Sequence, residues 1–96
     1  MTQVFLAKSK DHLLVFPSMM PHDEEFELWA RVFLHHDGIS QLAFEQGADR
    51  HLMRFYFNQM QFGLNFEHYS ESIWISPEEH QANAHLAALL ALLNNN

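Results

Sequence analysis

The chain has 96 residues, 48% hydrophobic and 14% aromatic, which favours one folded domain over 1–96 with a core rich in Phe. Twelve acidic against five basic side chains give a net charge of −7 with His neutral, which argues against nucleic acid as a partner because such binding relies on Lys and Arg. The absence of Cys excludes disulfides, thiolate metal sites and Cys nucleophiles. No signal-peptide pattern and no apolar run of roughly 20 residues is present, so we expect a soluble, cytoplasmic protein with no membrane partner.

The first third of the chain predicts a β-hairpin followed by a helix. Apolar runs at 4–7 and 12–16 flank the polar turn KSKD, as in two antiparallel strands. The stretch 22–38, HDEEFELWARVFLHHDG, has apolar side chains at helical spacing and an acidic start. Its two final His residues and Gly38 are typical of a helix C-terminus, so we expect this helix to end at Gly38.

The middle of the chain predicts a strand meander. Residues 39–45 form a short predicted strand, and QGAD turns the chain. Apolar residues then alternate with a period of two in 51–57 and 60–66, on either side of Asn58 and Gln59. A two-residue turn places Phe57 opposite Met60, Phe55 opposite Phe62, Met53 opposite Leu64 and His51 opposite Phe66. Continuing the buried face into Ile73 and Ile75 makes 68–71 a four-residue loop.

The last part of the chain predicts a second helix. SPEE offers Ser76 as an N-cap, Pro77 at the first helical position and Glu79 three residues after the cap. This capping box predicts a helix from Pro77 to about Leu93, followed by a frayed tail at 94–96. The expected fold class is therefore α+β, with an antiparallel sheet of five or six strands and two helices packed on one face.

The predicted second helix is apolar on nearly all sides. Leu86, Leu89, Leu90 and Leu93 form a stripe, and Ala residues occupy much of the remaining surface. A helix of this kind is covered on more than one side. Either it packs deeply between the sheet and the first helix, or the leucine stripe is the seam of a homodimer.

The predicted register gathers polar and aromatic residues on the sheet face away from the helices. Arg50 lies opposite Glu67, while Asn65 and Trp74 align across neighbouring strands. Aromatic and Arg side chains dominate the energetics of protein interfaces, so this face is the candidate surface for an unknown protein partner. The alternative is an ordinary solvated sheet face with a cross-strand ion pair. The candidate binding residues are Arg50, Arg54, Tyr56, Asn65, Glu67 and Trp74.

A second candidate lies at the sheet rim on the opposite face, where Asp49, His51 and His68 could converge. Two imidazoles and a carboxylate suit a transition metal or an acid–base pair, and a polar rim closing the core is the alternative. No HExxH spacing, nucleophile elbow or glycine-rich phosphate loop is present, so no cofactor and no catalytic residue are predicted. A small-ligand pocket lined by Phe and Met has the same composition as a filled core, and stays open.

The stretch from Gly47 to Ile75, GADRHLMRFYFNQMQFGLNFEHYSESIWI, resembles a family of short bacterial proteins known as a domain of unknown function. GADRH and NFEHYSESIW carry the resemblance, which reaches from the first helix through Ile75. It implies a small bacterial cytoplasmic protein and no activity. The residues within its motifs are Gly47, Asp49, Arg50, His51, Glu67, Tyr69, Ser72 and Trp74.

These features favour a non-enzymatic protein-interaction or adaptor module, with a metal-binding or catalytic domain and a small-ligand-binding domain as alternatives. Within the first class, an acidic protein that blocks its partner, such as an antitoxin or immunity protein, would require a basic partner. The net charge of −7 is compatible with that role.

Overall fold

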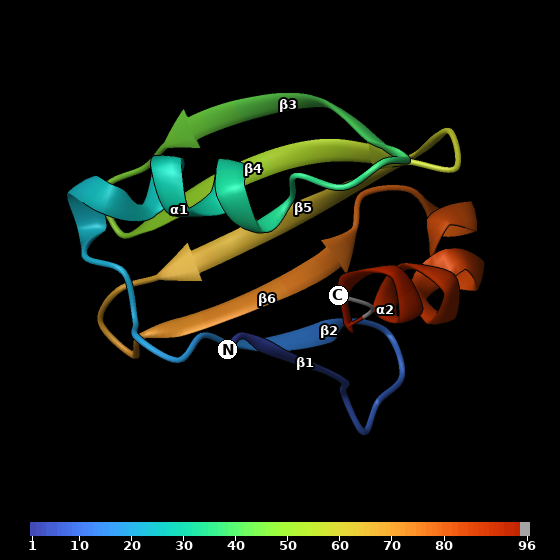
Figure 1. The fold of residues 1–96 in the computed structure, drawn as a ribbon, viewed down its shortest axis with the longest axis horizontal. Helices are drawn as coiled ribbons and strands as arrows, with labels where there is room; N and C mark the ends of the chain where they lie inside the picture. The colour runs from blue at the N-terminus through green and yellow to red at the C-terminus, as the bar shows by residue number, and fades with distance from the viewer. Residues whose placement is uncertain (95–96) are drawn as a thin grey trace.

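The fold is a single six-stranded antiparallel sheet with two α-helices on one face, in a computed structural model that describes residues 1–94 (Figure 1). This confirms the predicted α+β class. None of the described helices is long and apolar enough to cross a membrane. The strands are β1 (Gln3–Leu6), β2 (Leu13–Phe16), β3 (Ile39–Gln46), β4 (Arg50–Phe57), β5 (Met60–Glu67) and β6 (Ser72–Pro77). The helices are η1 (Asp23–Glu25), α1 (Phe26–Phe33), η2 (His80–His85) and α2 (Leu86–Asn94), where η marks a 3₁₀ helix.

The strand order across the sheet is β1-β2-β6-β5-β4-β3. The first hairpin therefore joins the sheet beside β6, so β2 pairs with a strand about 60 residues later in the chain (Figure 1). The edges of the sheet are β1 and β3. This order places the first hairpin next to Trp74, which a reading of local alternation alone could not establish.

The central hairpin has the predicted register. Asn58 and Gln59 have φ values of 52° and 64°, as expected for the type I′ turn that matches strand twist. Phe57 pairs with Met60 and His51 with Phe66. The loop between β5 and β6 spans residues 68–71, also as predicted.

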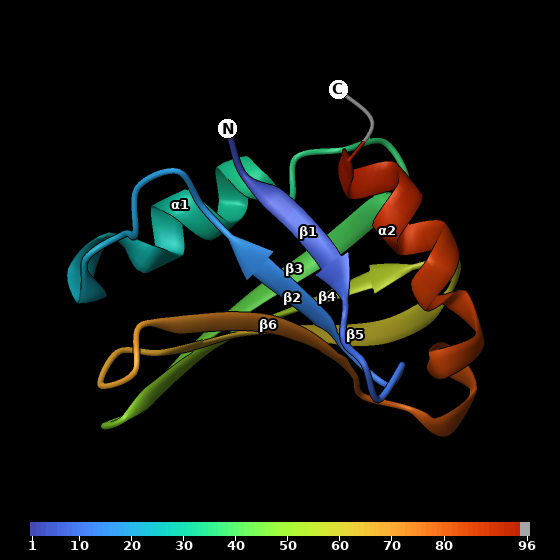
Figure 2. The same cartoon turned by 90° about the horizontal axis from the view of Figure 1, so that it is seen from below.

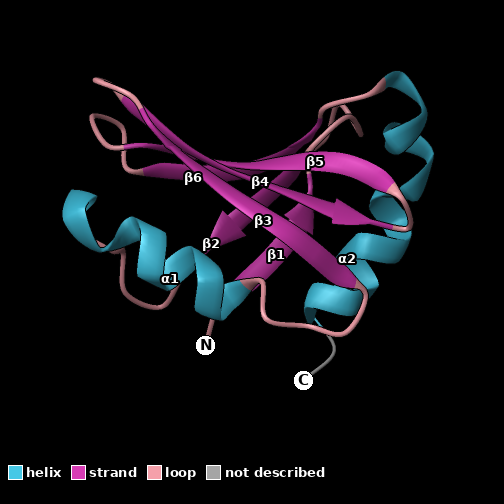
Figure 3. Cartoon of the chain, turned by 90° about the horizontal axis from the view of Figure 1, so that it is seen from above, coloured by secondary structure: helices cyan, strands magenta, loops and turns pink. Residues whose placement is uncertain are grey.

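The core lies between the sheet and the two helices, which share one face of the sheet (Figures 2 and 3). Its largest fully buried side chains include Phe55, Phe62 and Phe66 from the sheet, Phe26 at the start of α1, and Leu89 from α2. The rings of Phe26 and Phe66 stack with their centroids 5.1 Å apart, and this contact attaches α1 to β5. The expectation of a Phe-rich core is confirmed.

The first helix is shorter than predicted. It starts with the 3₁₀ turn η1, and α1 ends at Phe33, with Leu34 as its C-cap. His35 and His36 bond to Val32 and Leu34 through their backbone amides in a tight turn that follows the helix. Gly38, with φ of 98°, leads into β3 rather than capping α1.

The capping box predicted at Ser76 is wrong. Strand β6 continues through Pro77, and the amide of Glu78 donates to the carbonyl of Gln61 at 2.9 Å. The carboxylate of Glu79 accepts from the amide of Gln61 at 2.7 Å, so it extends the sheet contact instead of capping a helix. Helical structure starts only at His80, because Pro77 and Glu78 still pair with β5 and Glu79 has an extended backbone.

The apolar helix α2 packs within its own chain. Leu86, Leu89 and Leu93 are buried in the core and Leu90 is partly buried against it, so most of the predicted dimer seam is already covered. A homodimer stays a prediction. The prediction of a frayed tail is wrong at Asn94, whose side chain accepts from the amide of Val4 at 3.3 Å and donates to its carbonyl at 3.0 Å. The rest of that predicted tail, residues 95–96, lies outside the described residues.

Candidate functional site

The sheet face away from the helices, here called the outer face, carries a continuous row of side chains. Residues that pair across the strands run from the edge strand β1 to the edge strand β3. Neither α1 nor α2 lies over this face (Figures 2 and 3). The row consists of Phe5, Leu14, Trp74, Asn65, Leu52 and Glu45.

The β1–β2 end of the outer face is apolar and open. Phe5 is 49% exposed and Phe16 is 52% exposed, and their ring centroids lie 5.8 Å apart. Leu14 and Trp74 pair directly across β2 and β6 and are each partly buried. We call Phe5, Leu14, Phe16 and Trp74 the aromatic patch. Exposed apolar clusters of this kind mark interaction surfaces more often than isolated exposed residues do.

A groove of about 510 Å³ runs along β6 on the outer face. Leu14 and Trp74 line its middle. Glu67 lies at the end where β6 starts, and Asp11 lies at the end where β6 leaves the sheet. Its other lining residues are His12, Ser70, Ser72, Ile73 and Ser76.

Arg50 and Glu67 occupy paired positions, as predicted, but each has another partner. The guanidinium of Arg50 lies 5.8 Å from the centre of the Trp74 ring, a cation–π geometry. Within the described residues, Arg50 and Glu67 form no ion pair. Arg50 therefore supports the Trp74 ring and stays exposed itself.

Glu67 holds the β5–β6 loop. Its carboxylate accepts from the Ser70 hydroxyl and from the backbone amides of Tyr69, at 3.1 Å, and Ser70, at 3.3 Å. The Ser70 hydroxyl is the main cause that lowers the pKa of Glu67, because it stabilises the charged form. At the other end of the groove, hydrogen bonds from Ser9 and then His12 lower the pKa of Asp11. Both ends of the groove therefore carry ionised carboxylates at neutral pH.

The remaining predicted surface residues have other roles. Arg54 forms ion pairs with Glu78, at 3.1 Å, and Glu45, and these bonds raise its pKa in that order of size. Asn65 is only 6% exposed, and its amide nitrogen lies 3.1–3.3 Å from acceptors on β5 and β6, so it is a structural residue. Tyr56 lies toward β3 and lines a separate small hollow beside Gln59.

At the inner rim, the structure brings His51 and His68 together as predicted, but with Asp23 rather than Asp49. The His51 Nε2 atom contacts a carboxylate oxygen of Asp23, and the His68 Nδ1 atom lies 3.6 Å from the same oxygen. Asp23 comes from η1, so this contact ties the start of the helical segment to β4. Asp49 is exposed in the β3–β4 turn.

His51 is buried in an aromatic cage. It is 2% exposed, and its ring centroid lies 5.7 Å from that of Phe44 and 6.1 Å from those of Phe26 and Phe66. The Nδ1 atoms of His51 and His68 are buried with no hydrogen-bond partner. Within residues 1–94, no three His, Asp or Glu side chains are arranged to hold a metal ion. The geometry thus favours a structural contact between helix and sheet.

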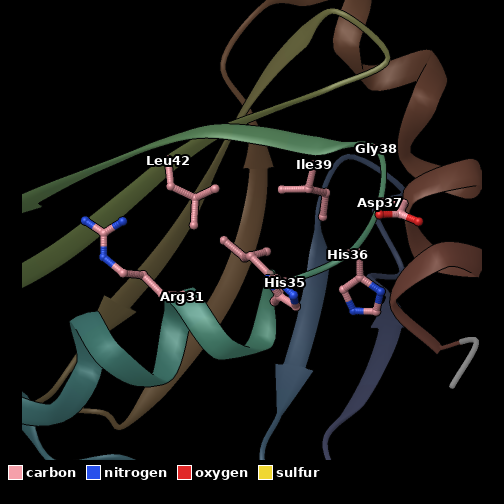
Figure 4. Close-up of a pocket in the computed structure, with 8 residues that line it drawn as sticks. Arg31, His35, His36, Asp37, Gly38, Ile39 and Leu42 are labelled. Atoms are coloured by element: carbon pink, nitrogen blue, oxygen red, sulfur yellow. The ribbon is translucent and has the colours of Figure 1, made fainter.

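A further cleft of about 750 Å³ separates the end of α1 from the edge strand β3 (Figure 4). Ile39 and Leu42 of β3 point toward the helix, and Arg31, His36 and Asp37 line the remaining side. Arg31 is already paired with Glu27 at 3.0 Å, the predicted i,i+4 ion pair. The β-bulge between Ser40 and Ala43 interrupts the edge, which disfavours the addition of another strand there.

Comparison with known protein families gives one match, to the family described as "Protein of unknown function (DUF3630)", over residues 1–95. The chain belongs to this family. Comparison with curated proteins and with solved structures finds no match. The match covers nearly the whole chain, including α2, and a family of unknown function assigns no activity.

In this member of DUF3630, the two motif stretches quoted above lie at the same end of the sheet. The turn that holds Gly47 and Asp49 precedes β4, and the loop at 68–71 joins β5 to β6 beside it. Only Gly fits at position 47 without a steric clash, because a Cβ there would lie 2.4 Å from the carbonyl oxygen of Arg50. The same oxygen accepts a hydrogen bond from the Gly47 amide at 3.0 Å. The motif residues therefore shape the end of the outer face.

Sequence analysis missed Phe5, Leu14 and Phe16, because they join Trp74 only through the pairing of β2 with β6. A signal was present. The run LLVF in β2 is apolar at every position, whereas a strand with one solvated face alternates. The sequence of β2 thus predicts apolar side chains on both faces of the strand, and the helices cover only one of these faces.

Proposed function

We propose that this protein is a non-enzymatic interaction module that binds a partner protein on its outer sheet face. The observation that supports the proposal most is the aromatic patch, which combines two half-exposed Phe rings with Trp74 on a face that neither α1 nor α2 covers. Trp is among the residue types that most often contribute a large share of binding energy at protein interfaces. Arg50 lies against the partly buried Trp74 ring and restrains it, which lowers the entropy lost when a partner binds.

The contacts around the patch also favour binding over folding as its role. Phe5 and Phe16 contact each other, yet about half of each side chain remains in water. Leaving them exposed gives up roughly 25 cal/mol for each Å² of apolar area that could be buried. A partner that covers them would gain this free energy on association.

The test is capture of partners from a lysate of the organism that encodes the chain. Wild-type protein, Trp74→Ala and Phe16→Ser serve as bait. Leu28→Ala is the matched control, because Leu28 is 71% exposed on α1, on the opposite side of the sheet. We expect Trp74→Ala to reduce capture about tenfold or more, and Phe16→Ser to reduce it less.

Urea unfolding of the same preparations separates binding from stability. Trp74→Ala is expected to lower the free energy of unfolding by less than about 1.5 kcal/mol, since the side chain is only partly buried. A larger loss would assign Trp74 to the core. Capture that is equal for wild type, Trp74→Ala and Phe16→Ser would contradict the proposed function.

A further inference from the structure

The groove along β6 lies next to the aromatic patch and differs from it in charge. Its lining contains two carboxylates, Glu67 and Asp11, and neither Lys nor Arg. Arg50 lies against the Trp74 ring and is not part of the lining. Lys8 and Lys10 belong to the exposed β1–β2 turn, outside the lining. The groove is therefore apolar in the middle and negative at both ends.

The two carboxylates are held in place by hydrogen bonds, and among the described residues neither is paired with Lys or Arg. Glu67 accepts from the β5–β6 loop, and Asp11 accepts from Ser9 and from the His12 ring at 2.7 Å. No Lys or Arg within residues 1–94 forms an ion pair with either one. Their negative charge is thus available to a ligand, and each carboxylate is already oriented at low entropic cost.

The spacing of the carboxylates defines the shape of a ligand. They lie on opposite sides of β6, Glu67 beside Ser72 on β5 and Asp11 just before β2 near the far end of the groove, and the four steps of β6 from Ser72 to Ser76 span about 13 Å. An extended peptide covers the same length along β6 with five residues, from position i to position i+4. Side chains at positions i and i+4 of such a peptide point to the same side, since the strand period is two.

We propose that the groove binds an extended segment of the partner protein, with Lys or Arg at two positions about four residues apart and apolar residues between them. This inference rests on the proposed function and names the chemistry of the partner. The basic side chains reach Glu67 and Asp11, and the apolar centre lies on Leu14 and Trp74. The net charge of −7 attracts such a segment at longer range.

The experiment is selection of peptides from a phage-displayed library of random 12-residue sequences, on wild-type protein and on Trp74→Ala. The selected consensus is then synthesised with a fluorescent label, and its affinity is measured by anisotropy. The test variant is Glu67→Gln combined with Asp11→Asn, which keeps the hydrogen-bond acceptors and removes both charges. The control is Glu24→Gln combined with Glu71→Gln, two exposed carboxylates outside the groove with the same total charge.

We expect a consensus with two basic residues about four positions apart. The test variant should bind this peptide roughly fivefold more weakly than wild type, and the control variant should bind it with the wild-type affinity. Raising the salt concentration should weaken binding to wild type more than to the test variant. Peptides that require Trp74 but show no basic pair, or that bind the test variant equally, would overturn this inference and leave the proposed function intact. Selection that enriches nothing over Trp74→Ala would also overturn it, and partner capture would then decide the proposed function separately.

Discussion

The two faces of the sheet use aromatic side chains in opposite ways. On the inner face, Phe55, Phe62 and Phe66 are completely or almost completely buried against the helices. On the outer face, Phe5 and Phe16 keep about half of their surface in water. The same sheet therefore supplies a core through β4 and β5 on one side and an exposed apolar surface through β1 and β2 on the other. The difference separates residues that stabilise the fold from residues that we propose to bind.

Strand β4 shows the contrast in two consecutive residues. His51 points inward, is 2% exposed and contacts Asp23, while Arg50 points outward and lies over Trp74. The inner contact connects two elements of the fold. The outer contact only orients a ring. Substitutions at these positions should therefore differ in their effect on stability.

The largest expected effect is on the inner face. Phe66→Ala should lower the free energy of unfolding by about 3–5 kcal/mol, because it leaves a cavity beside Phe26. Phe16→Ala, the same change on the outer face, should cost less than about 1 kcal/mol. Urea unfolding of both variants measures the difference. Equal losses would show that the outer face is covered in solution and would remove the contrast.

The next effect concerns the inner rim. His51→Ala should lower the free energy of unfolding by about 2–4 kcal/mol, since it empties the aromatic cage and removes the contact with Asp23. Arg50→Ala should cost less than about 1 kcal/mol, the usual size of an exposed cation–π contact. Thermal unfolding monitored by circular dichroism is suitable for both. A His51→Ala protein as stable as wild type would leave the buried imidazole without a structural role.

The smallest effect is the acid dependence of the outer face. Hydrogen bonds, chiefly from the Ser70 hydroxyl, lower the pKa of Glu67 on folding. The stability that the charged Glu67 adds to the folded state is therefore fully present above its pKa in the unfolded chain. The contribution disappears as the pH falls through the lower pKa of the folded state. The stability difference between wild type and Glu67→Gln should therefore narrow on acidification below about pH 5. Unfolding at several pH values, with Glu71→Gln as the charge control, measures this; a constant difference would contradict the role of the loop contacts.

Local patterns predicted the meander because period-two alternation and a two-residue turn determine register together. Phe57 opposite Met60 follows directly from that rule. The capping box failed because Glu79 satisfies a backbone amide of β5, a contact that depends on tertiary structure. The prediction of Asp49 at the inner rim also failed because of a tertiary contact. Asp23 of η1 contacts His51 instead, and sequence spacing does not show that η1 packs against β4.

The candidate surface was predicted in part. Trp74 and Glu67 line the groove, and Arg50 lies over the Trp74 ring, on the face that the register indicated. Asn65 is buried and bonds to β5 and β6, and Arg54 is neutralised by Glu45 of β3 and by Glu78 of the segment after β6. Phe5 and Phe16 could be assigned to this surface only once the strand order was known, because that order joins the first hairpin to β6.

The most direct test of the central claim is hydroxyl-radical labelling of the protein in lysate and after purification, read by mass spectrometry for each residue. If the outer face binds a partner, Phe5, Phe16 and Trp74 should be labelled several-fold less in lysate than in the purified protein. Leu28 and Val32, exposed on α1, should be labelled equally in both samples. Equal labelling of the aromatic patch in the two samples would contradict the proposal that this face is a docking surface.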